Sequence, residues 1–371
     1  MEKDKFAKEI LKTGFVLENR IAVELKRSGW TVISNKYYED DLEGSVREID
    51  LLAYKVRKIQ HLDVYTTLLI SFKKSESNAW ALLARAINLK DPNSDWWPLH
   101  TWSNDKALLY ELSQPGRAKN YHNDVLALGV TEAISIPSVD VFAFQEMKCS
   151  SGAPQNDKNI FNALTSLMKA QAYEISALPR RKSQSQVSVY QFNLLSIIDS
   201  DLVRLNFIGD DIEAQQIDSE HYIARYIIKK IEIFSRIRFI KATYFKKALA
   251  DYNQLHIANC KWFDRAYNNF FDGIAEDSKR TEVLIEEFRD KLRKSRLGIV
   301  LKVKKGLDVK DVSLNWLSKQ SKLAVTLPVD SEFIESLNQN DEAKKMVAET
   351  LKEIYRYSGD FCFSEKDDFL F

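Results

Sequence analysis

Residues 46–75 decide the fold of this chain, and they read VREIDLLAYKVRKIQHLDVYTTLLISFKKS. The stretch predicts two β-strands joined by a short polar loop. Because side chains alternate along a strand, Asp50 interrupts a largely apolar first strand, and Ser71 and Lys73 share one face of the second. If the strands pair, Asp50 and Lys73 project into one shared space.

These residue types suit chemistry on a phosphate. A carboxylate such as Asp50 binds Mg²⁺ through oxygen, and an ammonium such as Lys73 orients a water or stabilises a charged phosphoryl transition state. We therefore take the hairpin as the active or binding centre.

A helix is predicted before the hairpin, because apolar residues recur every three or four positions from about residue 3 to residue 28 and Gly29 ends the pattern. Glu18 flanks this apolar stripe, where a helix facing the sheet would point its carboxylate at the hairpin. A solvated surface role is the default for an isolated glutamate on such a helix. Both interpretations of Glu18 stay open from periodicity alone.

Three consecutive blocks resemble bacterial nuclease-like proteins of the PD-(D/E)XK restriction-endonuclease-like superfamily: TGFVLENRIAVELKRSGW (13–30), YYEDDLEGSVREIDLLAYK (37–55) and LLISFKKSESNAW (68–80). Their order of helix, strand, strand is also that of the family. The resemblance implies that Asp50 is the metal-binding aspartate, Lys73 the catalytic lysine and Glu18 the acidic residue of the first helix. It further implies Mg²⁺ or Mn²⁺ as cofactor.

One position departs from the family pattern, since Ser71 stands where the family usually carries Glu. A serine hydroxyl is a neutral and weak Mg²⁺ ligand, so the second carboxylate would come from Glu18 and Ser71 would add only a hydrogen bond. Glu48 and Glu76 are weaker alternatives to Glu18. The competing hypothesis is a catalytically silent copy of the fold that binds nucleic acid or a partner protein.

The resemblance implies an enzyme that cleaves DNA, with RNA as an alternative substrate, in bacterial restriction or defence against phage. A partner protein of such a defence system, or a homo-oligomer assembled through the C-terminal region, is left open.

Length and composition predict two domains. The chain has 371 residues, of which 45% are hydrophobic and 29% charged, which is typical of a soluble protein with substantial cores. We expect an α/β domain over residues 1–245, with a mixed sheet flanked by helices and an insertion at about 80–155. Residues 246–371 are expected to form a mainly helical region.

The formal net charge of +1 gives no long-range attraction for nucleic acid, so binding needs a local basic patch. The strongest basic stretch is 225–247, where aromatic residues are interleaved with cations that suit phosphate contact. An ordinary strand with one solvated basic face explains the same pattern. The candidate nucleic-acid-binding residues are Arg225, Lys229, Lys230, Arg236, Arg238 and Lys241.

Other segments carry weaker patterns. Helices are expected near 79–89, after Asp157, over 276–296, and after Asn340 to about Tyr357. Strands are expected over 31–35, 138–147, 187–198, 202–209, 299–305 and 323–329.

Several classes of site are disfavoured by the sequence. Three distant cysteines and five histidines show no zinc or redox spacing, and no Gly-rich phosphate loop is present. The charged N-terminus lacks the apolar core of a signal peptide, and no run approaches 18 apolar residues. We therefore expect a cytoplasmic protein that does not enter a membrane.

Overall fold

The chain divides into two units in a computed structural model. Unit 1 comprises residues 1–104 and 115–263, and unit 2 comprises residues 105–114 and 264–371. The chain therefore passes between the units at 104/105, at 114/115 and within helix α6 (Phe245–Phe271). The structure describes residues 3–11, 13–40, 44–60, 62–182, 186–305 and 309–366.

Unit 1 is built on a mixed sheet that contains the predicted hairpin. Strands β2 (Val46–Ile59) and β3 (Leu62–Lys74) are antiparallel and longer than the sequence pattern suggested. The sheet order is β1-β2-β3-β7-β11-β10, and the short β5 (Thr101–Ser103) also pairs with β7. The β3–β7 and β7–β11 pairs are parallel. The remaining strands are β1 (Thr31–Glu39), β7 (Ser188–Asp199), β10 (Ser219–Ile228) and β11 (Ile231–Lys241).

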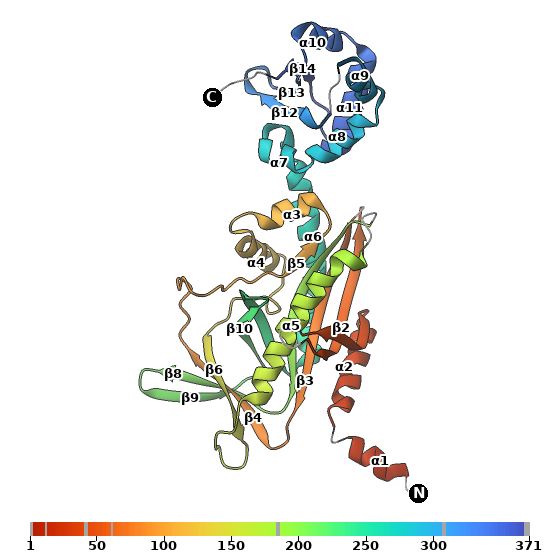
Figure 1. Ribbon diagram of the computed structural model, residues 1–371. Coiled ribbons are helices and arrows are strands. Elements are labelled where there is room, and N and C mark those ends of the chain that lie inside the picture. Colours follow the sequence, from red (N-terminus) through yellow and green to blue (C-terminus); the bar gives the residue numbers. More distant parts are fainter. Residues whose placement is uncertain are drawn as a thin grey trace. The chain divides into compact units, whose positions relative to one another are not determined.

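Helices cover both faces of this sheet. Helix α5 (Lys158–Arg181) lies across one face (Figure 1) and packs its apolar side on a core that includes Leu52 and Leu69. Helix α6 reaches the opposite face. Its Asn259 donates to Thr66 Oγ1 at 2.8 Å, and the side chain of Thr66, three residues before Leu69 on β3, points to the other side of the sheet from Leu69. Unit 1 is therefore an α/β structure with a mixed sheet between helices.

A second sheet in unit 1 has the order β6-β4-β8-β9. The predicted helix at 79–89 was wrong, since these residues form β4 (Asn78–Arg85) between β6 and β8. A short apolar run such as WALLA is buried almost throughout in this central position, and periodicity alone cannot separate such a strand from a helix. The other strands of this second sheet are β6 (Asp140–Lys148), β8 (Leu202–Ile208) and β9 (Asp211–Gln216).

The predicted N-terminal helix is two helices, α1 (Lys3–Ile10) and α2 (Phe15–Arg27). Thr13 ends α1, because its N–H and hydroxyl both donate to Ile10 O, at 3.0 and 2.7 Å. Elsewhere in unit 1, α4 spans Arg117–Ala127. No helix in the described ranges is long and apolar enough to cross a membrane.

Unit 2 combines helices with a three-stranded sheet of order β12-β13-β14. The strand predicted at 299–305 was wrong, because these residues belong to helix α9, which buries Leu297 and Leu301 at a spacing of four. The helix predicted after Asn340 is confirmed as α11, and the Asn340 side chain accepts the N–H of Ala343.

The elements of unit 2 are α3 (Lys106–Ser113), α7 (Ser278–Val283), α8 (Ile285–Arg293), α9 (Arg296–Lys305), α10 (Ser331–Asn338), α11 (Asp341–Tyr355), β12 (Ser313–Leu317), β13 (Lys322–Leu327) and β14 (Phe361–Glu365). Short 3-10 turns lie at Ile274–Glu276, Val309–Asp311 and Ser318–Gln320.

Candidate active site at the β2–β3 hairpin

The hairpin brings Asp50, Ser71 and Lys73 to one face of the sheet. Leu52 and Leu69 are register partners, and both lie in the core beneath α5. Asp50 is two residues from Leu52, and Ser71 and Lys73 are two and four residues from Leu69, so alternation directs all three toward the same side.

Asp50 lies against the second strand through a direct hydrogen bond. The N–H of Phe72 donates to Asp50 Oδ2 at 2.7 Å, just beyond the last register pair of Leu51 and Ile70. Phe72 is the residue between Ser71 and Lys73. The carboxylate of the first strand is therefore tied to the Ser-x-Lys segment of the second.

Glu18 lies in the first turn of α2, which packs against β1 and β2. It is half-buried, and its pKa is raised above the usual glutamate value by burial, then by the negative charge of Asp50, then by that of Glu48. The structure thus brings the two predicted metal-binding carboxylates within electrostatic reach of one another.

The weaker acidic candidates have other partners. Glu48 is exposed and accepts a hydrogen bond from Asn35 Nδ2 at 2.6 Å. Glu76 is exposed and forms an ion pair with Lys74 at 3.5 Å.

Ser71 and Lys73 differ in accessibility. The Ser71 side chain is buried, whereas Lys73 is half-buried. No described residue forms a hydrogen bond or an ion pair with Lys73. Its neighbour Lys74 instead donates to Leu11 O at 3.0 Å. The Lys73 ammonium is therefore available to an external ligand.

The donor set offers two carboxylates for a divalent cation. Within the described ranges, no group of three or more His, Cys, Asp or Glu side chains is arranged to hold a metal ion. Mg²⁺ commonly takes only one or two carboxylates and completes its shell with water and substrate phosphate oxygens. Asp50 and Glu18 fit that smaller set.

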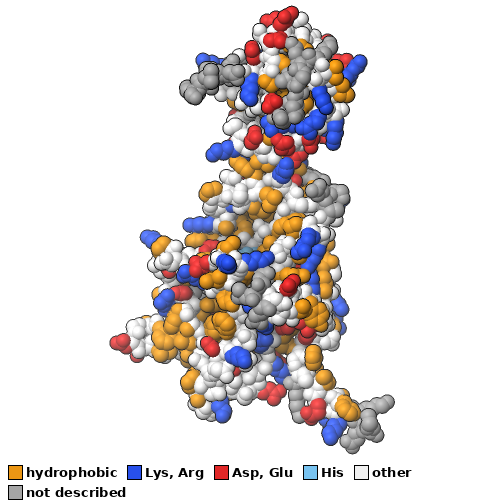
Figure 2. All heavy atoms as spheres, in the orientation of Figure 1, with side chains coloured by type: hydrophobic (Ala, Val, Ile, Leu, Met, Phe, Trp, Pro, Cys, Tyr) orange, Lys and Arg blue, Asp and Glu red, His pale blue; other side chains and the backbone are white. Residues whose placement is uncertain are grey.

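The six candidate nucleic-acid-binding residues do not form one surface. Arg225 is exposed and pairs with Glu232 at 2.6 Å, and Lys241 pairs with Asp201 at 3.2 Å. Lys229 and Lys230 are exposed at the turn between β10 and β11. Figure 2 shows basic side chains interspersed with acidic and hydrophobic ones on the face that it draws.

Arg236 and Arg238 point inward instead. Arg236 donates to the carbonyl oxygens of Ser135 and Trp96, at 2.8 and 3.0 Å. Arg238 is 1% exposed and pairs with Glu132 at 2.7 Å. Both arginines serve internal contacts, so a phosphate-binding role for this stretch would rest on its exposed cations.

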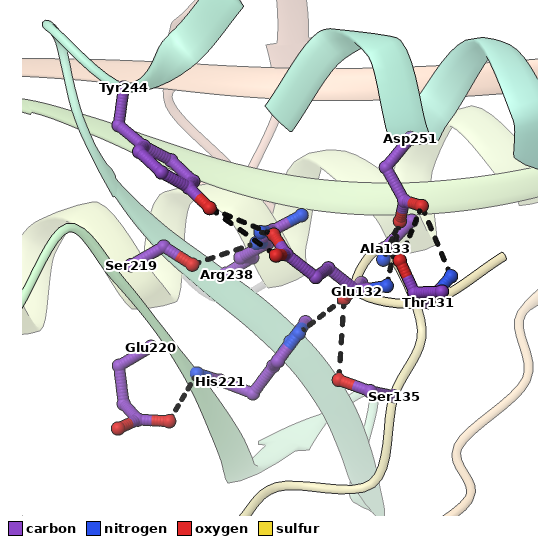
Figure 3. Close-up of polar contacts among 10 residues, drawn as sticks. All are labelled: Thr131, Glu132, Ala133, Ser135, Ser219, Glu220, His221, Arg238, Tyr244 and Asp251. Carbon is purple, nitrogen blue, oxygen red and sulfur yellow. Dashed lines mark hydrogen bonds and ion pairs between the residues drawn. The ribbon is translucent and has the colours of Figure 1, made fainter. Parts of the chain in front are cut away.

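A polar cluster around Glu132 was not predicted from the sequence. Figure 3 shows Arg238 and Tyr244 converging on the Glu132 carboxylate, while His221 Nε2 lies 2.7 Å from the Glu132 carbonyl oxygen. Asp251 of α6 accepts the N–H groups of three successive residues, Thr131 to Ala133. The segment that contains them has no regular periodicity, so no sequence signal identified it.

The structure thus places Asp50, Ser71 and Lys73 on one face of the hairpin, with Glu18 of α2 within electrostatic reach of Asp50. Comparison of the chain with protein-family models, with curated proteins and with solved structures found no match.

Proposed function

We propose that this chain is a Mg²⁺-dependent nuclease with a restriction-endonuclease-like core in unit 1, which hydrolyses phosphodiester bonds of DNA. The observation that carries the proposal is the hydrogen bond from Phe72 N–H to Asp50, which joins the aspartate to the Ser-x-Lys strand. RNA is the alternative substrate, and a role in bacterial defence rests on analogy with the superfamily.

Each side chain of the site has a distinct part in this proposal. Asp50 and Glu18 would hold the ion, which when bound polarises a phosphoryl oxygen and makes a bound water more acidic. Lys73 would orient the attacking water or neutralise charge that develops on the phosphoryl oxygens. Ser71 would donate a hydrogen bond.

Electrostatics support a cation at this place. Burial, and after it the negative charge of Asp50, raises the pKa of Glu18, so the two carboxylates repel one another. A divalent cation between them would replace that repulsion with two attractions. The exposed Arg225, Lys229 and Lys230 offer phosphate contacts away from the site.

A second candidate is a silent scaffold of the same fold that binds nucleic acid or a partner protein. It is favoured by Ser71, which supplies no carboxylate, and by the lack of a three-ligand group in the described ranges. Loss of a carboxylate from a two-carboxylate family site weakens Mg²⁺ binding.

A cleavage assay separates the two candidates. Purified protein would be incubated with plasmid, linear and single-stranded DNA and with RNA, in Mg²⁺ and in Mn²⁺, beside Asp50→Asn and Lys73→Met. Lys74→Met is the matched control, because Lys74 is the next lysine on the same strand and alternates to the other face. Cleavage lost in both site variants and kept in the control supports the nuclease.

Other outcomes decide against it. Cleavage that survives both site variants would come from elsewhere. If the wild type binds DNA in a salt-sensitive way without cleaving, the silent scaffold is favoured. Gain of cleavage in Ser71→Glu would then identify the missing carboxylate as the cause.

A further inference from the structure

A small cavity lined by residues of unit 1 lies at a gap in the main sheet. Strand β5 pairs with β7 as far as Gln191, and β11 pairs with β7 only from Leu194 onward. Phe192 and Asn193 lie between these two ladders and line the cavity, which has a volume of about 20 Å³. A cavity needs roughly 10 to 15 Å³ to hold one water, so the space admits an occupant of about that size.

Arg236 borders this cavity at the point where the β11 ladder stops. It precedes Ile237, the first β11 residue paired with β7. Its two terminal nitrogens donate to carbonyl oxygens, whereas its Nε is shielded from solvent and has no hydrogen-bond partner. Burial lowers the pKa of Arg236 to about 10, so the guanidinium is still protonated at neutral pH.

No described carboxylate forms an ion pair with Arg236. Arg238, which also lines the cavity, has Glu132 as its counter-ion at 2.7 Å. For Arg236, Asp95 acts only as a more distant charge. The Arg236 side chain is half-buried, with its Nε shielded from solvent. A partly desolvated guanidinium without an adjacent counter-ion is destabilising, even when it is hydrogen-bonded.

Arg236 is therefore the one cation of the cavity wall without an adjacent counter-ion among the described residues. None of the lining residues is acidic, and the charge of the second lining arginine, Arg238, is compensated by Glu132. His122 Nδ1 lies 2.8 Å from Ala118 O, and burial together with the charge of Arg236 lowers the pKa of His122 to about 3. Burial lowers the pKa of His100, whose Nε2 lies 2.9 Å from Phe234 O, so this ring is also neutral at pH 7. The histidines therefore add no compensating or competing charge.

We propose that this cavity binds one small monovalent inorganic anion of about the size of chloride, as the counter-ion of Arg236. The ion would join β7 and β11 to the segments that close the cavity, which contribute Leu99, Tyr121 and Ala133. The site is distinct from the β2–β3 hairpin, and it does not depend on nuclease activity.

Halide-dependent stability tests this inference on the full chain. Thermal or urea unfolding would be followed in bromide, chloride or gluconate at fixed total ionic strength, so that general screening stays constant. Above the dissociation constant, each tenfold rise in halide should raise the ratio of folded to unfolded protein about tenfold. Equal stability in halide and in gluconate would overturn the proposal.

A variant pair assigns the effect to the cavity. Arg236→Met keeps the aliphatic length and removes the charge, and its stability should not respond to halide. Arg225→Met is the matched control, because Arg225 is an exposed arginine on the neighbouring strand, and its halide response should equal that of the wild type. A halide response that persists in Arg236→Met would place the ion elsewhere.

Crystals of the wild-type protein soaked in bromide give a measurement that does not require the variant to fold. An anomalous peak within hydrogen-bonding distance of Arg236 supports the site. A cavity that holds water only, with no anomalous signal, refutes it.

Discussion

Charge repulsion between Glu18 and Asp50 gives a test of the site that needs no catalytic activity. We expect Glu18→Gln to stabilise unit 1 at pH 7, because it removes one of two like charges and makes a half-buried side chain neutral. Solvent screens a residue that is still partly exposed, so the gain should be about 0.3–1 kcal/mol. Glu24→Gln, on the same helix, is the control and should change stability less.

The effect has a defined pH dependence. Because the pKa of Glu18 is raised in the folded protein, the wild-type carboxyl binds its proton more tightly when folded than when unfolded. The native protein therefore loses stability as the pH rises through that raised pKa. The advantage of Glu18→Gln should be full above this pH and should disappear below the ordinary glutamate pKa.

A double-mutant cycle makes the repulsion measurable. Glu18→Gln and Asp50→Asn would be made singly and together, and urea unfolding would be followed by tryptophan fluorescence, which reports mainly on unit 1 because six of the seven tryptophans lie there. We expect the double variant to gain less than the sum of the single variants. Additive free energies would refute the electrostatic contact.

The same unfolding measurements, made with and without Mg²⁺, test whether the two carboxylates hold an ion. An ion held by both carboxylates should stabilise the wild type by about 1.4 kcal/mol at ten times its dissociation constant. Either single variant should lose most of that gain. Equal Mg²⁺ effects in all four proteins would contradict the metal site.

Three further predictions concern the structure around the site and in unit 2. Gly298→Ala should destabilise unit 2 by about 1–3 kcal/mol in denaturant unfolding, because the added Cβ would clash with the backbone oxygen of Leu292. Asp251→Ala should speed amide hydrogen exchange at residues 131–133 at least about tenfold, because their N–H groups lose a charged acceptor. At pH 8 a thiol reagent should modify the exposed Cys149 long before Cys260, whose pKa is raised by burial to about 11.

Matched variants show whether these effects have the stated causes. Gly14→Ala should be neutral or slightly stabilising, since its φ is −67° and no atom lies within 4 Å of the added Cβ. Asp251→Asn keeps one acceptor oxygen and should accelerate exchange less than Asp251→Ala. Labelling of Cys260 at the rate of Cys149 would show that α6 opens readily in solution.

The hairpin and its alternating faces could be predicted because the evidence for them is local. Strand periodicity in residues 46–75 fixed which side chains share a face, and the bond between Phe72 and Asp50 is consistent with that assignment. Residues 246–371 were expected to be mainly helical, but the bounds of helix α6 were not predicted, although its buried Phe245, Leu249 and Tyr252 recur every three or four positions. Its register depends on partners distant in sequence, such as Thr66 for Asn259.

The basic stretch on β11 shows why charge alone could not locate a surface. The alternation of side chains along residues 231–241 predicted that the cations share one face of a strand, but it did not predict whether solvent or protein covers that face. The segment that contains Glu132 and Ser135 closes over Arg236 and Arg238 from about 100 residues away in sequence. Long-range closure of this kind leaves no trace in the local pattern of the strand.

The repulsion between Glu18 and Asp50 also bears on the choice between enzyme and silent scaffold. Without a bound cation, this repulsion destabilises the fold, and neutralising either carboxyl group would relieve it. A scaffold that only binds through exposed cations gains nothing from the repulsion. A metal-dependent site would use it, because a divalent cation held by Glu18 and Asp50 would offset their mutual repulsion. Ser71 lowers the number of charged ligands, but it leaves this pair intact, so the pair rather than the serine is the feature on which the proposed activity depends.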